Sequence, residues 1–249
     1  MKELIKKIEK KKIKLDSFRP LSPELVKNLD EWFKIELTYS SNAIEGNTLT
    51  LQETALVVEK GLTIGGKSVQ EHLEAINLAF AIDYIKTLVN KSKKNLTLND
   101  ILKIHNLILK KIDDKNSGKF RKIAVKISGS KAVLPDPVKV PELMNEFINW
   151  LHETKENILN IAADAHLKFV LIHPFVDGNG RTARLILNLL LMQGGYPPAL
   201  ILKEERLEYL KSIQKAQLEN KLDDYYKIIF GAVDRSLDIY LKAVEKSNF

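Results

Sequence analysis

The sequence predicts an all-α fold, a helical bundle that carries one short β-hairpin. Apolar residues recur at helical spacing along most of the chain, as in the segment 21–41. Helix-start signals such as Thr50-Leu51-Gln52-Glu53 precede several of these segments. Only residues 120–140 alternate apolar residues around a glycine turn, which is typical of a hairpin. One mostly helical unit with an inserted hairpin follows from these observations.

The expected elements follow in order along the chain. Pro23 suits the first turn of the first helix, and a second helix starts after Thr50 and is broken between Gly61 and Gly66. The later helices are expected over residues 69–89, 97–112, 142–154, 158–172, 181–193, 204–222 and 224–246. The hairpin is expected where Val125, Ile127 and Val133 surround Ser128-Gly129-Ser130.

Composition excludes several classes of protein. The 249 residues allow one large domain or two small ones. The absence of cysteine excludes disulfides and cysteine-ligated metals. The N-terminus lacks the apolar stretch of a secretory signal, and no apolar run reaches the length of a membrane span. We therefore expect a cytoplasmic protein without a membrane partner.

The net charge of +7 raises the question of nucleic-acid binding. Residues 1–14 account for +5 of this charge and the remainder of the chain for only +2. A basic terminal segment is equally typical of a solvated helix end, and no recognised DNA- or RNA-binding motif accompanies it. We expect no nucleic-acid partner.

The stretch 173–184, His-Pro-Phe-Val-Asp-Gly-Asn-Gly-Arg-Thr-Ala-Arg, carries the strongest chemical signal. Gly178 and Gly180 let the backbone approach a ligand without a Cβ clash, and a helix starting there aims free N–H groups at the same point. Asn179 adds an amide donor. The stretch contains neither the G-x-G-x-x-G of a dinucleotide fold nor the Gly-Lys-Ser/Thr of a P-loop. It predicts a phosphate site of another kind.

The charged residues of this stretch complete the site. Arg181 and Arg184 share one helix face near the helix N-terminus, which is unfavourable unless an anion sits between them. Asp177 can hold Mg²⁺ through one carboxylate while phosphates fill other positions. His173 titrates near neutrality and can accept a proton from a hydroxyl. The stretch predicts an enzyme that handles a polyphosphate.

This stretch resembles the Fic-domain signature, His-x-Phe-x-Asp/Glu-Gly-Asn-Gly/Lys-Arg-x-x-Arg, at every specified position. Residues 118–121, 140–144 and 195–198 are also similar to elements of that family, so the resemblance covers residues 30–245. It implies the Fic fold, with a β-hairpin flap beside the active site. It divides the chain into a Lys-rich helical extension, 1–30, and a Fic domain, 31–249.

The resemblance implies transfer of AMP from ATP, with Mg²⁺, to a Ser, Thr or Tyr hydroxyl of a protein target, with self-modification expected. The implied roles are a general base at His173, a Mg²⁺ ligand at Asp177, a phosphate cradle of Gly178, Asn179, Gly180 and Arg181, a γ-phosphate contact at Arg184, adenine contacts at Tyr209 and Gln217, and target pairing by the flap at Val125, Ile127 and Val133.

The segment Ser41-Asn42-Ala43-Ile44-Glu45-Gly46 resembles the inhibitory motif of the Fic class that carries an N-terminal inhibitory helix, here at about residues 31–47. The resemblance implies that Glu45 pairs with Arg184 and misplaces the triphosphate. Taken by itself, Glu45-Gly46 would only end a helix.

Two other functions stay open at this point. The same site, with Glu45 aligning a water, could remove AMP from a modified protein, and a nucleotide-binding regulatory module could retain the glycines and arginines. Some similar proteins pair around residues 66–69, which leaves a homodimer open. The target, the acceptor hydroxyl and the nucleotide selectivity are not encoded in a recognisable pattern.

Overall fold

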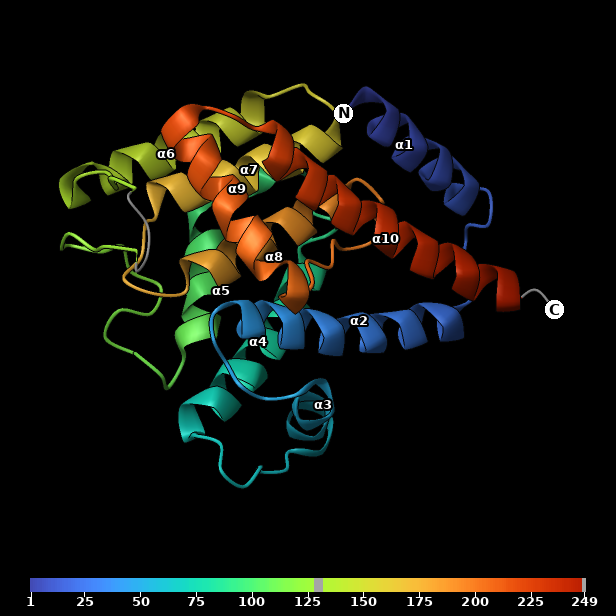
Figure 1. The fold of residues 1–249 in the computed structure, drawn as a ribbon, viewed down its shortest axis with the longest axis horizontal. Coiled ribbons are helices and arrows are strands. Elements are labelled where there is room, and N and C mark those ends of the chain that lie inside the picture. Colours follow the sequence, from blue (N-terminus) through green and yellow to red (C-terminus); the bar gives the residue numbers. More distant parts are fainter. Residues whose placement is uncertain (128–131, 248–249) are drawn as a thin grey trace.

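The computed structural model describes residues 1–127 and 132–247, and these residues contain ten α-helices, three short 3₁₀ turns and no β-strand (Figure 1). The α-helices are α1 (Lys2–Asp16), α2 (Pro23–Ile44), α3 (Leu51–Lys60), α4 (Val69–Thr87), α5 (Leu98–Leu109), α6 (Val140–Glu153), α7 (Ile158–Ile172), α8 (Asn179–Gln193), α9 (Arg206–Glu219) and α10 (Asp223–Ser247). The all-α prediction is confirmed.

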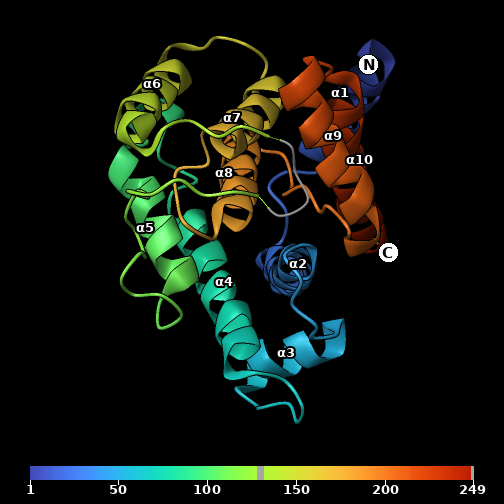
Figure 2. The same ribbon diagram turned by 60° about the vertical axis from the view of Figure 1, so that its left-hand side comes forward.

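Helix α8 lies at the centre of the molecule (Figure 2). Its residues are buried on every face, with Ala183, Leu187 and Leu190 fully inaccessible. A helix that is buried all round needs neighbours on all sides, and α7, α4, α5 and α2 supply them. The start of α8, which holds the 173–184 stretch, is therefore positioned by the packing of several helices.

Local capping signals fix most helix starts. Thr50 forms the predicted capping box, and Ser68 and Thr97 form two more of the same type, each with an acidic residue three positions later. Gly61 ends α3 in the left-handed conformation that glycine adopts without strain. Helix α8 begins at Asn179, two residues before the predicted start, because Gly178 with φ 75° serves as its N-cap.

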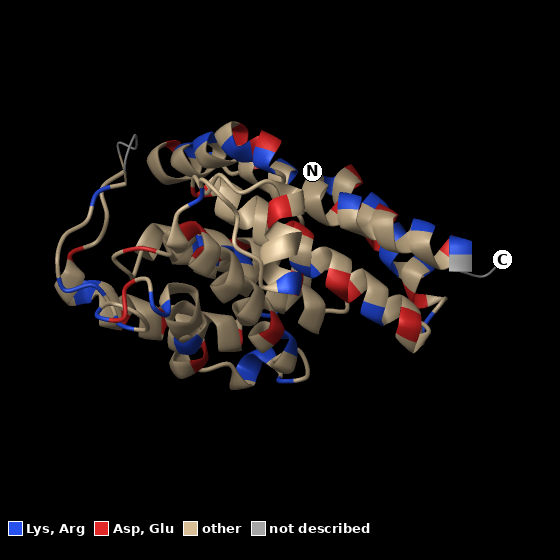
Figure 3. Ribbon diagram, turned by 90° about the horizontal axis from the view of Figure 1, so that it is seen from below, with Lys and Arg blue, Asp and Glu red and all other residues tan. Residues whose placement is uncertain are grey.

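The basic N-terminal segment forms α1, which packs along α10 (Figure 1). Lys7 and Lys11 pair with Asp234 at 2.7 and 2.6 Å, and Lys14 pairs with Glu245 at 2.6 Å. Figure 3 shows Lys and Arg interspersed with Asp and Glu over the face seen from below. Much of the excess charge at the N-terminus is therefore matched by acidic side chains of the chain itself.

The predicted hairpin is not found in the described part of the flap region, residues 120–127 and 132–140, where no strand forms. Its turn, Ser128 to Lys131, lies outside the described residues. The guanidinium of Arg121 occupies carbonyls that strand pairing would use, donating to Ile123 O at 3.3 Å and Pro135 O at 2.7 Å. Pro135 and Pro137 also lack the N–H that a ladder needs.

Helix α2 lies between the α3–α4 unit on one side and α10 on the other, in both ribbon views (Figures 1 and 2). Pro23 occupies its first turn, as predicted, and Ser22 caps its N-terminus. Its last residues, Ser41 to Ile44, are buried. Across the described residues, no helix combines the length and apolar character needed to cross a membrane.

Candidate functional site

The loop from His173 to Gly178 joins α7 to α8 and holds the candidate site. His173 ends α7 in the left-handed conformation, with φ 51°, and Gly178 starts α8 with φ 75°. Asn179 closes the loop on itself, because its amide oxygen accepts from Phe175 N and its amide nitrogen donates to Phe175 O, both at 2.9 Å. The Asn179 side chain thus fixes the loop rather than offering a free donor.

His105 of α5 packs against this loop and hydrogen-bonds to it. Its ring stacks on Phe175 at 3.5 Å between centroids, its Nε2 lies 2.9 Å from Asp177 O, and its Nδ1 accepts from Gly118 N at 2.9 Å. Burial lowers the pKa of His105 to about 4, so the ring is neutral and Nε2 carries the proton. A Cβ at Gly178 would lie 3.3 Å from this ring, which adds a packing reason for glycine there.

His173 is held at its backbone and partly buried at its ring. Its N–H donates to Phe169 O at 3.0 Å, and its carbonyl accepts from Arg121 Nε at 2.8 Å. Burial lowers the pKa of the imidazole below 6.5, and the Val170 carbonyl offsets this only in part. A neutral imidazole at neutral pH can accept a proton.

Asp177 and Arg181 form a charged pair at the first turn of α8. Asp177 is 60% exposed, and its carboxylate accepts from Gly178 N at 2.6 Å and from Arg181 Nη2 at 3.2 Å. The Arg181 side chain is only 3% exposed and lies 3.4 Å from Glu74 of α4. Among the described residues its buried Nε has no hydrogen-bond partner, which leaves an unused donor beside the loop.

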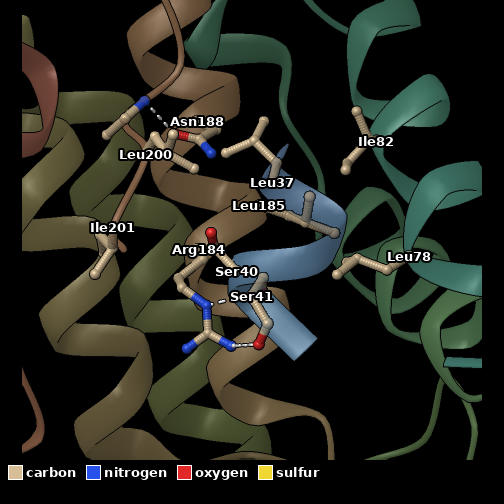
Figure 4. Close-up of a pocket in the computed structure, with 11 residues that line it drawn as sticks. Leu37, Ser40, Ser41, Leu78, Ile82, Arg184, Leu185, Asn188, Leu200 and Ile201 are labelled. Carbon is tan, nitrogen blue, oxygen red and sulfur yellow. Dashed lines mark hydrogen bonds between the residues drawn. The ribbon is translucent and has the colours of Figure 1, made fainter. Parts of the chain in front are cut away.

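Arg184 of α8 meets the end of α2 (Figure 4). Its Nη2 donates to Glu45 Oε1 at 2.7 Å and to Ser41 O at 2.9 Å, and its Nε donates to Ser41 Oγ at 2.9 Å. A Cβ at position 180 would collide with the Glu45 carboxylate, so Gly180 makes room for this approach. The structure thus brings together Ser41, Glu45, Gly180 and Arg184, and among these contacts the sequence analysis predicted the pairing of Glu45 with Arg184.

The charges at this contact stabilise each other. Burial alone would raise the pKa of Glu45, but the attraction and hydrogen bond of Arg184 outweigh it and lower the pKa below 4.5, helped by Arg181 and Arg206. Burial would lower the pKa of Arg184, and Glu45 more than offsets this. Arg206 Nε also donates to Ile44 O at 2.6 Å and so caps the end of α2.

Comparison with known proteins places the chain in a family. A family model described as "Fic/DOC family" matches residues 95–191. A solved segment of Fic-1 from C. elegans superimposes with a TM-score of 0.86 at 31% identity, covering 97% of this chain and 71% of that one. This chain belongs to the Fic/DOC family. A Fic domain containing signaling protein from Bacteroides thetaiotaomicron superimposes with a TM-score of 0.88 at 28% identity, over 96% of this chain and 97% of that one.

Curated relatives of this Fic chain carry an activity in their names. "Protein adenylyltransferase Fic" of Culex quinquefasciatus is 38% identical over 96% of this chain and 48% of that protein. The protein of the same name from Nematostella vectensis is 35% identical over 96% of this chain and 56% of its own length. The chain spans about half the length of the curated relatives it matches.

The two residues predicted to contact adenine, Tyr209 and Gln217, differ in their exposure to solvent. Gln217 of α9 is partly exposed and donates to Val133 O of the flap at 3.4 Å. Tyr209 is 1% exposed, with its hydroxyl 2.7 Å from His166 Nε2, inside the core and away from the surface expected of an adenine contact. Val125 and Ile127 are partly exposed, and Val133 is 86% exposed.

Sequence reasoning missed three residues that hold the Fic site: Glu74, His105 and Arg206. Each lies far along the chain from the residue it contacts, so no local pattern connects the two. A histidine among the apolar positions Ile101, Ile104 and Ile108 was one available signal, because a buried imidazole needs partners. Nothing in the sequence named those partners.

Proposed function

We propose that this Fic chain transfers AMP from ATP to a Ser, Thr or Tyr hydroxyl of a protein. The observation that carries the proposal is the start of α8, where a neutral His173, an exposed Asp177 and the buried guanidiniums of Arg181 and Arg184 surround one helix N-terminus. The names of the curated relatives support the same reaction. The protein target is not specified by the site.

The reaction follows from these groups. His173 accepts the proton of the target hydroxyl while that oxygen attacks the α-phosphorus of ATP. The new P–O bond forms as the bond from the α-phosphorus to the β-phosphate oxygen breaks, and pyrophosphate leaves. The protein's main contribution is to orient the attack and to stabilise negative charge on the phosphates.

Phosphate binding rests on the first turn of α8. The free N–H groups there and the unused Nε of Arg181 offer donors to the phosphates. Asp177 fits Mg²⁺ as a single exposed carboxylate, and no group of three metal-ligating side chains stands ready within the described residues. Substrate phosphates and water would complete the coordination. The ion would neutralise phosphate charge during transfer.

We further propose that Glu45 restrains the activity. The Glu45 carboxylate occupies Arg184, the guanidinium that the family resemblance assigns to the γ-phosphate. A negatively charged phosphate and a carboxylate cannot both bind this group closely, since like charges repel at short range. ATP must displace Glu45 or bind with its triphosphate out of line.

Glu45→Gly tests both proposals. We expect the variant to incorporate about tenfold more AMP than the wild type, into itself or into added protein, because a charge-assisted pair of this kind contributes about 1.5–3 kcal/mol before solvent screening. Incorporation is measured with ATP labelled at the α-phosphate. Glu31→Gly is the matched control, since Glu31 lies on the same helix with a side chain that is 61% exposed. Equal labelling of the Glu45 variant and the wild type would contradict the restraint.

His173→Ala in the Glu45→Gly background separates chemistry from binding. We expect AMP incorporation to fall by about 100-fold or more, the usual contribution of a general base, while ATP affinity is retained. Persistent transfer by the double variant would reject the role of His173. Incubating the labelled product with wild-type protein, Mg²⁺ and no ATP measures the alternative activity, in which water displaces AMP from the modified hydroxyl.

A further inference from the structure

Arg121 lies between the loop that carries His173 and the flap, and its guanidinium contacts both. The residue is only 2% exposed. Its Nε donates to His173 O at 2.8 Å, its Nη1 to Ile123 O at 3.3 Å and its Nη2 to Pro135 O at 2.7 Å. All three acceptors are main-chain carbonyls, so one side chain connects three separate places along the backbone.

This set of acceptors distinguishes Arg121 from the other arginines that are buried within the described residues. Arg181 and Arg184 each pair with a carboxylate, whereas the hydrogen bonds of the Arg121 side chain all go to uncharged groups. Burying a cation without a charged partner is unfavourable. A lysine carries its donors on one nitrogen, whereas a guanidinium spreads them over three in a rigid plane. The geometry of arginine is therefore what this position uses.

The first contact falls on the residue that carries the proposed base. His173 has φ 51°, a left-handed conformation that is strained for a residue other than glycine. No side chain among the described residues hydrogen-bonds to its ring. The direction of the imidazole therefore depends on the main chain, and Arg121 holds two consecutive carbonyls there, because its own N–H donates to Pro174 O at 2.9 Å.

The other two contacts fall on the flap arms, residues 122–127 and 132–135. Ile123 belongs to the first arm and Pro135 to the second, so the guanidinium bridges the two. The side chains of Ile123 and Val133 are nevertheless 61% and 86% exposed. The arms are thus fixed through their main chain while these apolar side chains stay open to a partner.

The segment that precedes the flap is itself attached to the loop at the start of α8. Phe120 packs on Phe175 with 5.8 Å between ring centroids. Gly118 N donates to His105, whose ring stacks on the same Phe175. Arg121 therefore extends from a main chain that already has a fixed place beside the site.

We propose that Arg121 is a positioning residue that fixes the flap relative to the main chain of His173, so that a target segment held by the flap presents its hydroxyl to the imidazole. This inference rests on the proposed function, because it takes His173 as the base and the flap as the segment that pairs with the target. The base and the acceptor hydroxyl are held by different segments of the chain, and Arg121 sets the distance between them. A misplacement of about 1 Å between reacting groups can lower a rate about 100-fold.

The test is Arg121→Lys in the Glu45→Gly background, with kcat and the KM for ATP measured from the incorporation of labelled AMP. The variant keeps the positive charge and loses the planar fork. We expect kcat to fall about 100-fold and the KM for ATP to change by less than about twofold, because the proposed phosphate donors belong to α8 and none of the Arg121 hydrogen bonds reaches that helix. Rates are taken per folded molecule, from urea unfolding of each variant. An unchanged kcat, or a KM for ATP that rises as much as kcat falls, would overturn the proposal.

Arg121→Met is the second variant and Arg19→Lys the matched control. Methionine buries no charge, so it keeps the test valid if the lysine variant does not fold. We expect it to lose as much kcat as Arg121→Lys, and a methionine variant that keeps the parent kcat would contradict the proposal. Arg19 also donates to a main-chain carbonyl far along the chain, Gly195 O at 2.8 Å, but outside the site. We expect Arg19→Lys to keep the parent kcat, and a fall equal to that of Arg121→Lys would show that the loss is not specific to the flap.

The parent variant separates this inference from the proposed function. Transfer of labelled AMP by Glu45→Gly tests the function itself. If that variant transfers AMP and Arg121→Lys transfers it equally fast, the positioning role is wrong while the function stands. If Glu45→Gly transfers no AMP, the proposed function fails first.

Discussion

Arg184 is surrounded by groups that compensate its burial. Its side chain is 7% exposed, yet it keeps its charge because Glu45 and Ser41 accept hydrogen bonds from its guanidinium. A guanidinium without such partners would be costly to bury. The same compensation makes the carboxylate replaceable by another anion, and a phosphate has the charge and the acceptor geometry to do so.

At this scale we predict how Glu45→Gln changes stability with pH. The folded-state pKa of Glu45 is lowered, so its ion pair stabilises the fold above 4.5, the unfolded value, and this stability is lost as pH falls through the folded pKa. Because the side chain is 39% exposed, solvent screening limits the effect to about 1 kcal/mol.

The measurement is the free energy of urea unfolding of wild type and Glu45→Gln between about pH 8 and pH 4. Comparing the two proteins cancels the titration of the other carboxylates. We expect a constant difference down to about pH 5.5 and a shrinking one below the unfolded pKa. A difference that grows on acidification would contradict the ion pair.

Helix α1 illustrates how an exposed, charged element is attached to the core. Ile8 and Leu15 are fully buried where α1 contacts α10, and lysines on either side pair with acidic residues of α10. The buried pair supplies most of the stabilisation, since exposed ion pairs contribute little.

At the scale of the element we predict the effect of removing one of these apolar contacts. Ile8→Ala should lower the free energy of unfolding by about 3 kcal/mol, because it removes buried methyl groups and leaves a cavity. Ile13→Ala on the same helix is the control, since Ile13 is 69% exposed and should cost less than about 0.5 kcal/mol. Similar losses in both variants, measured by urea unfolding, would show that α1 does not dock through Ile8.

At the scale of the molecule, the α3–α4 unit presents apolar side chains to solvent. Val69 and Phe80 of α4 are 76% and 60% exposed, and their eleven-residue separation places them on one face of the helix. Leu62, just after α3, is 52% exposed. Exposed apolar residues gathered on one unit are typical of an interaction surface.

We predict that this surface joins two copies of the chain, as the family resemblance around residues 66–69 implies. Val69→Asp should shift the protein toward the monomer, because it places a charge in an apolar contact. Light scattering after size-exclusion chromatography measures the mass at several concentrations, with Leu207→Asp, at another exposed apolar position (55% exposed), as the control. A wild type that stays monomeric throughout, or a Val69→Asp variant that associates as before, would contradict the prediction.

Most of the helices could be predicted because their signals are local. The capping boxes at Thr50 and Thr97 and the glycine at Gly61 act within one turn, and the structure places helix ends at each. The flap could not be predicted in the same way. Its alternating residues predict a hairpin whose turn lies outside the described residues, and no strand forms in the described residues on either side. There Arg121 donates to backbone carbonyls of the segment and of His173, contacts that no local pattern of the sequence indicates.

The sequence by itself determined the helical architecture and the run of chemical groups from His173 to Arg184, because helix periodicity, capping and short-range spacing are properties of neighbouring residues. Only the tertiary structure decided which residues from distant parts of the chain contact the stretch 173–184. Glu45 lies 139 residues before Arg184, and Tyr209, which the family resemblance implies as an adenine contact, has its hydroxyl buried against His166 where α7 and α9 meet. Contacts of this kind arise from the simultaneous burial of several helices, so they become visible only when the helices are assembled.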